Sequence, residues 1–202
     1  MSMQFLINNL SRYKPRSIQI NSRFAAVAII VYLSDEDSEL FLIKRKVHPN
    51  DPWSGQIGLP GGHLETKDKD LIETAIRETC EETTIMLTRD HLICQIDDQQ
   101  GYAKGGQIDL TVRPFVFVVD QKPAAIQINY ELERAYWLSA NHFQQPENHI
   151  YFDPMNTAQL RPGVQIDQAN VLWGMTYRIL TDFFTAMDHE SIFINDRHIS
   201  NR

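Results

Sequence analysis

Apolar and polar residues follow clear periods along the first part of the chain. In Met3–Tyr13 the apolar residues recur three and four positions apart, which predicts a short amphipathic helix. Arg23–Leu33 is a run of apolar and β-branched residues and predicts a buried strand. Leu40–Val47 repeats that pattern after a polar turn at 35–38, so we expect the two strands to form a hairpin.

The middle of the chain predicts two strands with a helix between them. Gln56–Leu59 is a short strand ahead of Pro60–Gly62, at which the backbone must turn sharply. Asp70–Thr83 has helical periodicity. Ile108–Val119 is a strong strand in which Pro114 is expected to mark a sheet edge or a bulge.

The last third predicts further elements of both kinds. Ala135–Leu138 is a short strand, and Ser139 is suited to capping a helix after it. Tyr151–Ile166 is typical of a long hairpin, and Asn170–Met187 of an amphipathic helix. This mixture predicts one α/β domain over residues 1–202, with a mixed sheet covered by helices.

The composition narrows the class of protein. With 202 residues, 43% of them hydrophobic, the chain is long enough for a globular core. Its net charge of −7 disfavours nucleic acid and anionic membranes as partners. The longest apolar run, Phe24–Leu33, is about half of a membrane span. Cys80 and Cys94 have no metal-ligand spacing, and no signal-peptide pattern is visible, so we expect a cytoplasmic protein.

Three acidic residues share one face of the helix predicted at 70–83. Glu78, Glu81 and Glu82 stand at positions i, i+3 and i+4. Like charges at this spacing raise one another's pKa values, and a hard divalent cation removes that penalty. A solvated acidic face is the simpler explanation of such a triplet taken alone. A second stripe is expected to pack on the sheet and consists of Ile72, Ala75, Ile76, Thr79 and Thr83.

The residues before this helix extend the pattern. Gly61 and Gly62 let the backbone approach a ligand closely, and Asp68 follows six positions after Gly62. With Arg77 and the three glutamates the string is G-x5-D-x8-R-E-x-x-E-E. It resembles the Nudix box, G-x5-E-x7-R-E-U-x-E-E-x-G-U, in which U is bulky and aliphatic. The chain departs from the box at Asp68, in the longer spacing to Arg77, at Thr79 (the U position) and at Thr84 (the late glycine).

Outside the box the chain resembles the coenzyme A pyrophosphatase branch of Nudix hydrolases. Ser54–Gly62 is similar to its G-Q-[IV]-x-[FL]-P-G-G segment, and Asp109–Phe115 to its central strand. Glu131–Leu138 is similar to its E-V…W-V-P-L stretch, and Trp173–Thr176 to its W-G-x-T helix start. The similarity covers roughly Arg23–Phe184.

The coenzyme A motif of that branch is only partly present. Arg45 supplies its first arginine, but Asp51 and Trp53 stand near the positions of its later arginine and histidine. Coenzyme A, a related nucleotide derivative, ADP-ribose and a dinucleotide are therefore alternative substrates.

The resemblance implies an α/β/α sandwich and a metal site on the acidic helix. The metal, Mg²⁺ or Mn²⁺, would be held by Glu78, Glu82 and Glu81, and the carbonyl of Gly61 would complete the site. The resemblance also assigns catalytic roles to Glu78, Glu81 and Arg77. One glutamate would take the proton of the attacking water, and the arginine would orient the acids.

Substrate contacts are expected from three further residues. Arg45, Gln56 and Gly62 flank the expected cleft and are suited to meeting phosphates, although an exposed salt bridge explains Arg45 equally well. Glu131 is either an additional acid of the site or a carboxylate that holds backbone N–H groups at the start of a strand.

These features together predict a Mg²⁺-dependent hydrolase of a small nucleotide-type substrate. The bond cleaved would be the pyrophosphate bond of a nucleoside diphosphate linked to another group. Two other classes stay open, namely a nucleotide-sensing domain that does little or no chemistry and an acidic protein-interaction domain. Met3–Tyr13 is either a dimer arm, in which case the protein is a homodimer, or an ordinary packed helix.

Overall fold

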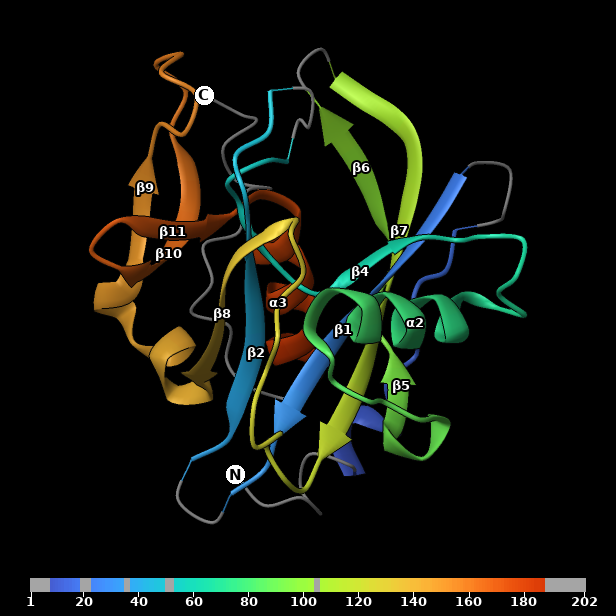
Figure 1. Cartoon of the computed structure of the whole chain (residues 1–202). Coiled ribbons are helices and arrows are strands. Elements are labelled where there is room, and N and C mark those ends of the chain that lie inside the picture. The colour runs from blue at the N-terminus through green and yellow to red at the C-terminus, as the bar shows by residue number, and fades with distance from the viewer. Residues whose placement is uncertain (1–7, 19–22, 35–36, 50–52, 104–105, 188–202) are drawn as a thin grey trace.

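The computed structural model describes residues 8–18, 23–34, 37–49, 53–103 and 106–187, whose strands form a large sheet and a small one (Figure 1). The large sheet contains β1 (Arg23–Tyr32), β2 (Glu39–Arg45), β3 (Ile57–Gly58), β4 (Gly61–His63), β5 (Leu92–Gln95), β6 (Gln99–Ala103), β7 (Gly106–Val119) and β8 (Leu132–Ser139). The small sheet contains β9 (His149–Phe152), β10 (Arg161–Asp167) and β11 (Asn170–Trp173). The helices are α2 (Leu71–Thr83), α3 (Gly174–Ala186) and the 3-10 turns Arg89–His91, Ala140–Gln144 and Pro146–Asn148.

Strand β1 lies at the centre of the large sheet. It runs parallel to β7 along its whole length, from Arg23 opposite Leu110 to its last residue. The predicted hairpin is confirmed, but β1 and β2 pair only next to the turn, where Val31 lies opposite Leu40. Farther from the turn the two strands diverge, and β4 pairs with β1 there. The chain does bend at Pro60, but Gly61 and Gly62, which we expected within the turn, already belong to β4.

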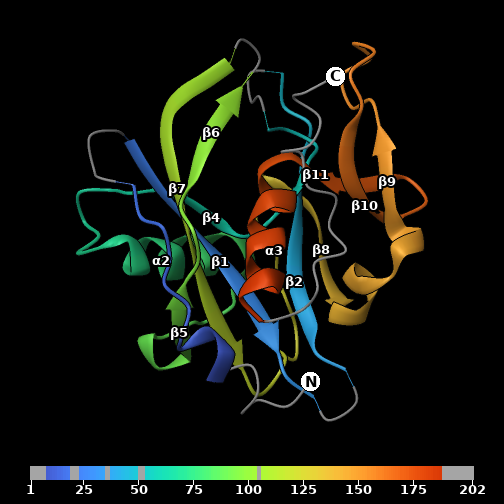
Figure 2. The ribbon, with the colours of Figure 1, turned by 180° about the vertical axis from the view of Figure 1, so that it is seen from behind.

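One helix covers each face of the large sheet, so the expected α/β/α arrangement is present (Figures 1 and 2). Apolar residues of β1 alternate between the two faces, as the period of a strand requires. Ile30 packs on the side of α2 together with Leu71 and Ala75, whereas Ile29 packs on the side of α3 together with Leu180 and Phe183. The acidic helix α2 is thus fixed on one face by its apolar side.

Two strand predictions need correction. Pro114 lies at neither an edge nor a bulge of β7, because β7 has β1 on one side and β5 and β6 on the other. Its carbonyl accepts from the N–H of Ile96, in the link between β5 and β6. The missing N–H of proline therefore falls at the junction of two neighbouring strands. Strands β5 and β6 were not predicted: β5 pairs with the far end of β7, where Leu92 lies opposite Phe117, whereas β6 forms a tight hairpin with the start of β7, where Ala103 lies opposite Gly106.

The C-terminal helix begins four residues later than predicted. Asn170–Trp173 is strand β11, and α3 starts at Gly174, whose φ of 67° breaks the extended chain. The predicted hairpin over Tyr151–Ile166 is confirmed by the antiparallel pair β9–β10. Ser139 caps the next turn as expected, since its hydroxyl accepts from the N–H of Asn141.

The described part of the predicted N-terminal helix packs on the chain itself. Residues 8–10 are helical, Leu10 is fully buried on the side of α3, and the Asn9 side chain donates to the carbonyl of Met187. Residues 3–7 lie outside the described residues. None of the described helices is both long and apolar enough to cross a membrane.

Candidate active site

Helix α2 is anchored at both ends and along one side. Its first turn is capped by Asp70, whose carboxylate accepts from the N–H of Glu73 at 3.0 Å. Thr79, in the U position, buries its hydroxyl by donating to the carbonyl of Ala75 at 2.7 Å. Thr84 adopts the left-handed conformation that the late glycine would take, with φ 60°. The departures at Thr79 and Thr84 therefore leave the helix intact.

Arg77 ties the acidic face of α2 to the loop before it. Its Nε and Nη2 each donate to Asp68 at 2.9 Å, and these bonds hold the pKa of that carboxyl below its usual range. Its Nη1 donates to Glu78 at 2.8 Å and to Glu81 at 3.1 Å. Asp68 also accepts from the hydroxyl of Thr74 at 2.9 Å. Arg77 thus orients two of the three predicted acids, and Asp68 braces the junction.

Glu82 is the most buried of the three glutamates. Its side chain is 4% exposed, and Oε2 accepts from the N–H of Gly61 at 3.0 Å. Burial raises the pKa of this carboxyl to about 8, against the opposing effect of Gly61 and of Arg45, whose Nη1 lies 3.8 Å from Oε1. Burying an ionised carboxylate here costs free energy of folding unless a cation lies close to it and balances its charge.

Glu78 lies against the glycine backbone of β4. A Cβ atom at Gly62 would stand 2.4 Å from Oε1 of Glu78, so only a glycine leaves room for this carboxylate. Burial raises the pKa of Glu78, although Arg77 offsets part of the effect. A Cβ atom at Gly61 would stand 2.2 Å from the carbonyl oxygen of Ala26. Gly62 is therefore required by the close approach of Glu78, and Gly61 by its close packing on β1.

Glu81 lies farther out than the other two acids. Its side chain is 50% exposed, and Lys67 approaches it to 3.5 Å. The three glutamates predicted as a set thus differ in environment: Glu82 is buried, Glu78 is mostly covered and Glu81 is at the surface.

The residues expected to meet substrate lie beside this face. Arg45 reaches Glu82, and its N–H donates to the carbonyl of Gln56 at 3.0 Å. The carbonyl of Glu131 accepts from the N–H of Lys46 at 2.8 Å, which brings Glu131 to the same region. Its N–H donates to the Asn129 side chain at 2.9 Å, while its own carboxylate is exposed. Trp53 packs partly buried against the core on the α3 side.

The segment before β8 contributes to the site in a way that the sequence did not predict. The N–H of Asn129 donates to the main-chain carbonyl of Glu82 at 2.9 Å, and that of Gln127 to the hydroxyl of Thr84 at 3.2 Å. These bonds satisfy groups at the end of α2. The only signal in the sequence is the alternation of Ile126 and Ile128, which pack on the core under α2.

The oxygen atoms of the three glutamates on α2 are the kind of ligand that a hard divalent cation binds. Their side chains are not grouped around a common point in this structure. Carboxylate oxygens are the ligands such a cation prefers, and Glu78 and Glu82 face the close-packed glycines Gly61 and Gly62. Within the described residues, however, no three His, Cys, Asp or Glu side chains are grouped closely enough to hold a metal as they stand. Arg77 and the N–H of Gly61 occupy oxygens that a cation would need.

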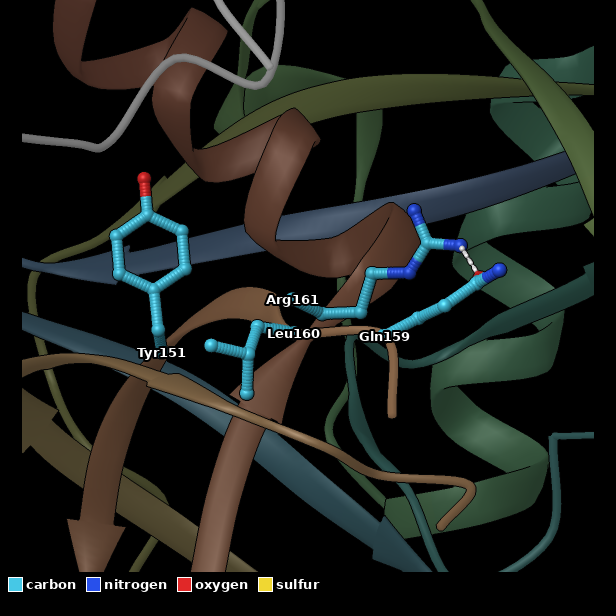
Figure 3. A pocket seen from close by; sticks show the side chains of 4 residues that line it. All are labelled: Tyr151, Gln159, Leu160 and Arg161. Carbon is cyan, nitrogen blue, oxygen red and sulfur yellow. Dashed lines mark hydrogen bonds between the residues drawn. The ribbon is translucent and has the colours of Figure 1, made fainter. Parts of the chain in front are cut away.

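A cavity elsewhere in the molecule lacks these features. It has a volume of about 470 Å³, is lined by Tyr151, Gln159, Leu160 and Arg161, and lies at the β9–β10 hairpin, far from α2 in Figure 1 (Figure 3). Arg161 donates to Gln159 at 3.1 Å inside it. Because none of these four residues is an acid, the cavity is not a second candidate for the metal site.

Comparison with known proteins adds independent information. The family model described as NUDIX domain matches residues 23–156. An uncharacterized protein of Schizosaccharomyces pombe is 30% identical over 158 residues, which cover 68% of this chain and 48% of that protein. The chain thus spans about half the length of this relative.

Two further proteins agree with this match. An uncharacterized Nudix hydrolase NudL of Yersinia enterocolitica is 32% identical over 138 residues, which cover 64% of this chain and 70% of that protein. The crystal structure of a MutT/nudix family protein from Enterococcus faecalis superposes with a TM-score of 0.51 at 16% identity, covering 87% of this chain and 63% of that one. At this identity the superposition supports the fold alone.

Proposed function

The chain belongs to the Nudix family, and from that premise we propose that it is a divalent-metal-dependent hydrolase that cleaves the pyrophosphate bond of a nucleotide derivative. The observation that carries the proposal is the pair Glu78 and Glu82. One helix buries two carboxylates beside the glycine backbone of β4, where burial raises the pKa of both and a cation would compensate them.

The reaction needs the acids to be held in place before substrate arrives. Glu78 and Glu82, with Glu81 and the carbonyl of Gly61, would hold the metal. Bound Mg²⁺ or Mn²⁺ supplies charge neutralisation at phosphoryl oxygens and lowers the pKa of water. Arg77 keeps Glu78 and Glu81 oriented through the bonds described above.

A proton must leave the attacking water, and three carboxylates are candidates to take it. Glu78 is the first choice because its carboxylate lies against the glycine backbone of β4 and burial raises its pKa, which makes it a better proton acceptor than a solvated glutamate. Glu81 and Glu131 are more exposed alternatives. Arg45, Gln56 and Gly62 would contact the diphosphate, since Arg45 already lies beside Glu82.

Product analysis tests the proposal. Purified protein with Mg²⁺ or Mn²⁺ is given coenzyme A, ADP-ribose, NADH, dinucleoside polyphosphates and nucleoside triphosphates, and products are separated by chromatography. We expect hydrolysis of at least one compound at its pyrophosphate bond, and loss of turnover by orders of magnitude in Glu82→Gln. The matched control is Glu133→Gln, an exposed acid of β8 paired with Lys44. Unchanged turnover in Glu82→Gln would contradict the proposal.

Within this class, coenzyme A is the substrate that the sequence resemblance suggests. Its cleavage to 3′,5′-ADP and phosphopantetheine would support that assignment, even though only Arg45 of the branch's motif arginines is retained. Faster hydrolysis of ADP-ribose or a dinucleotide would agree with the proposed metal site but would assign a different substrate.

One observation favours a binding domain without chemistry as the second candidate. Arg77 and Gly61 already engage oxygens of Glu78 and Glu82, and no metal-ready group of three acids exists among the described side chains. Tight binding of a nucleotide in excess Mg²⁺, with no product from any compound of the panel, would favour this function.

A further inference from the structure

Thr84 directly follows the acidic helix in a backbone conformation that its side chain disfavours. Its φ is 60°, in the left-handed region that glycine adopts without strain and a β-branched residue rarely adopts. Asn156 and Ala158 are the other non-glycine residues with positive φ in the part of the chain that the structure describes, and neither is β-branched. Strain of this kind persists where the surrounding structure holds it, so the contacts of the Thr84 side chain indicate its role.

The hydroxyl of Thr84 connects the end of α2 to the segment before β8. It donates to the carbonyl of Thr83 at 2.6 Å and accepts from the N–H of Gln127 at 3.2 Å. The glycine that the Nudix box has at this position carries no side chain that could accept from Gln127. The contact therefore exists because this chain departs from the box.

The segment that begins at Gln127 is held at two further places. The N–H of Asn129 donates to the main-chain carbonyl of Glu82 at 2.9 Å, and the Asn129 side chain accepts from the N–H of Glu131 at 2.9 Å. The carbonyl of Glu131 in turn accepts from the N–H of Lys46 at 2.8 Å. Residues 127–131 are thus fastened first to the end of α2 and then to the residue after β2.

These attachments bring Glu131 close to the buried acid of the site. Lys46 follows Arg45, whose Nη1 lies 3.8 Å from Oε1 of Glu82. Burial is the main cause of the raised pKa of Glu82, and the negative charges of Glu78 and Glu131 add to it. Because the side chain of Glu131 is exposed, its place depends on how the backbone of residues 127–131 is held.

We propose that Thr84 is a positioning residue of the candidate active site. Its hydroxyl holds residues 127–131 against the end of α2 and thereby sets the place of the Glu131 carboxylate beside Glu82. The inference rests on the proposed function, because Glu82 is a ligand of the proposed metal. A carboxylate held there adds negative charge next to that metal and strengthens its binding.

Mn²⁺ binding without substrate tests this role, with electron paramagnetic resonance as the readout. We expect Glu131→Gln to weaken Mn²⁺ binding about tenfold, as loss of a group around a metal site does. Thr84→Gly should weaken it about fivefold, as loss of one hydrogen bond does. Its melting temperature should change little, because glycine relieves the left-handed strain. Thr84→Ser keeps the hydroxyl and should bind Mn²⁺ like the unaltered protein.

Two further variants separate the hydroxyl from general effects. Ala158→Gly replaces another residue with a φ of 60°, in the β9–β10 hairpin far from α2 in Figure 1, and should leave Mn²⁺ affinity unchanged. The double variant Thr84→Gly with Glu131→Gln should bind Mn²⁺ like Glu131→Gln alone, because Thr84 acts through Glu131. With a hydrolysed compound, Thr84→Gly should lower kcat and leave KM unchanged, since no substrate contact is assigned to Thr84.

Four results would overturn this role of Thr84. They are unchanged Mn²⁺ affinity in Thr84→Gly, an equal loss in Thr84→Ser, additive losses in the double variant, and absence of Mn²⁺ binding by the unaltered protein. If Mn²⁺ affinity follows the expected pattern while no compound of the panel is hydrolysed, Thr84 keeps its role and the proposed hydrolase activity fails. If a compound is hydrolysed while Thr84→Gly binds Mn²⁺ like the unaltered protein, the activity stands and the role of Thr84 fails.

Discussion

At the scale of single residues, the fold places acids where their charge is poorly solvated. Glu82 accepts from one backbone N–H, that of Gly61, and its Oε1 lies 3.8 Å from the Nη1 of Arg45. Glu78 shares Arg77 with three other carboxylates, those of Glu65, Asp68 and Glu81. These buried carboxylates lower the free energy of unfolding of the metal-free protein, and a cation bound between them would raise it again.

Replacing Glu82 by glutamine should stabilise the metal-free protein. The pKa of Glu82 is raised in the folded state, so its favourable contribution is present below about pH 4.5 and is lost as pH rises through about 8. Glutamine avoids the buried charge and still accepts from Gly61. We expect Glu82→Gln to raise the free energy of unfolding at pH 9 by at least ~1 kcal/mol, and by much less at pH 4. Urea denaturation without metal measures this, and equal or lower stability at pH 9 would contradict it.

Gly62→Ala should displace Glu78 without unfolding the protein. The new Cβ would stand 2.4 Å from the carboxylate, which is the far end of a flexible side chain and can move away. We expect kcat to fall about a hundredfold, as misplacement of a catalytic group does, with little change in melting temperature. Gly58→Ala is the control, because its Cβ would make only an ordinary contact at 3.7 Å. Equal activity of the two variants would show that Glu78 needs no close approach to the backbone.

At the scale of elements, local signals predicted α2 and two of the hairpins, whereas the order of the strands in the large sheet depends on pairing between distant segments. Asp70 as a cap and the apolar stripe fix the helix from neighbouring residues, and the predicted start was one residue early. β5 depends on residues of β7 that lie far along the chain, and β11 is separated from the helix after it only by the backbone conformation of Gly174, so neither strand is indicated by its own residues. β6 and β11 each pair with a strand adjacent in sequence, and neither of these hairpins was predicted. The bond from Gly61 to Glu82 and the approach of Arg45 likewise join separate segments. Spacing alone could identify the acids but not rank their burial.

A segment between the N-terminal helical turn and β1 is fastened to the β5–β6 link through Asp97. This buried carboxylate accepts from the hydroxyl of Tyr13 at 2.7 Å, from the N–H of Arg16 at 2.8 Å and from the Arg16 side chain. Burial alone would raise its pKa, but these hydrogen bonds outweigh burial and lower it.

Asp97→Asn should therefore destabilise the protein in a pH-dependent way. A lowered folded-state pKa contributes stability above the unfolded value of about 3.8, and this is lost as pH falls below it. We expect a loss of about 1–3 kcal/mol at pH 7 that shrinks toward pH 3. Chemical denaturation of both proteins across this range gives the difference, and a loss independent of pH would contradict the assignment.

At the scale of the whole molecule, the segment after the family match completes the core. The match ends at residue 156, whereas α3 and its buried aromatics cover the second face of the large sheet. Phe184 is 1% exposed and packs against Phe143 and Phe183, with ring centres 5.8 and 5.3 Å away. The acidic helix α2 lies on the opposite face of the large sheet. We therefore expect substitutions in the core under α3 to affect stability and substitutions on α2 to affect the candidate site.

Phe184→Ala should lower stability without changing the site. Removing a buried phenylalanine costs about 3–5 kcal/mol, so we expect a clearly lower melting temperature. Below that temperature, KM for the best compound of the panel should match that of the unaltered protein. A large change in KM would show that the α3 face communicates with the site on α2.

The central claim is that Glu78 and Glu82 form a metal site, and direct Mn²⁺ binding tests it most plainly. Titration followed by electron paramagnetic resonance gives the dissociation constant of the unaltered protein, Glu82→Gln and the control Glu133→Gln without substrate. The account predicts Mn²⁺ binding by the unaltered protein and the control, with affinity at least tenfold weaker in Glu82→Gln. Equal Mn²⁺ affinity in all three proteins would contradict it.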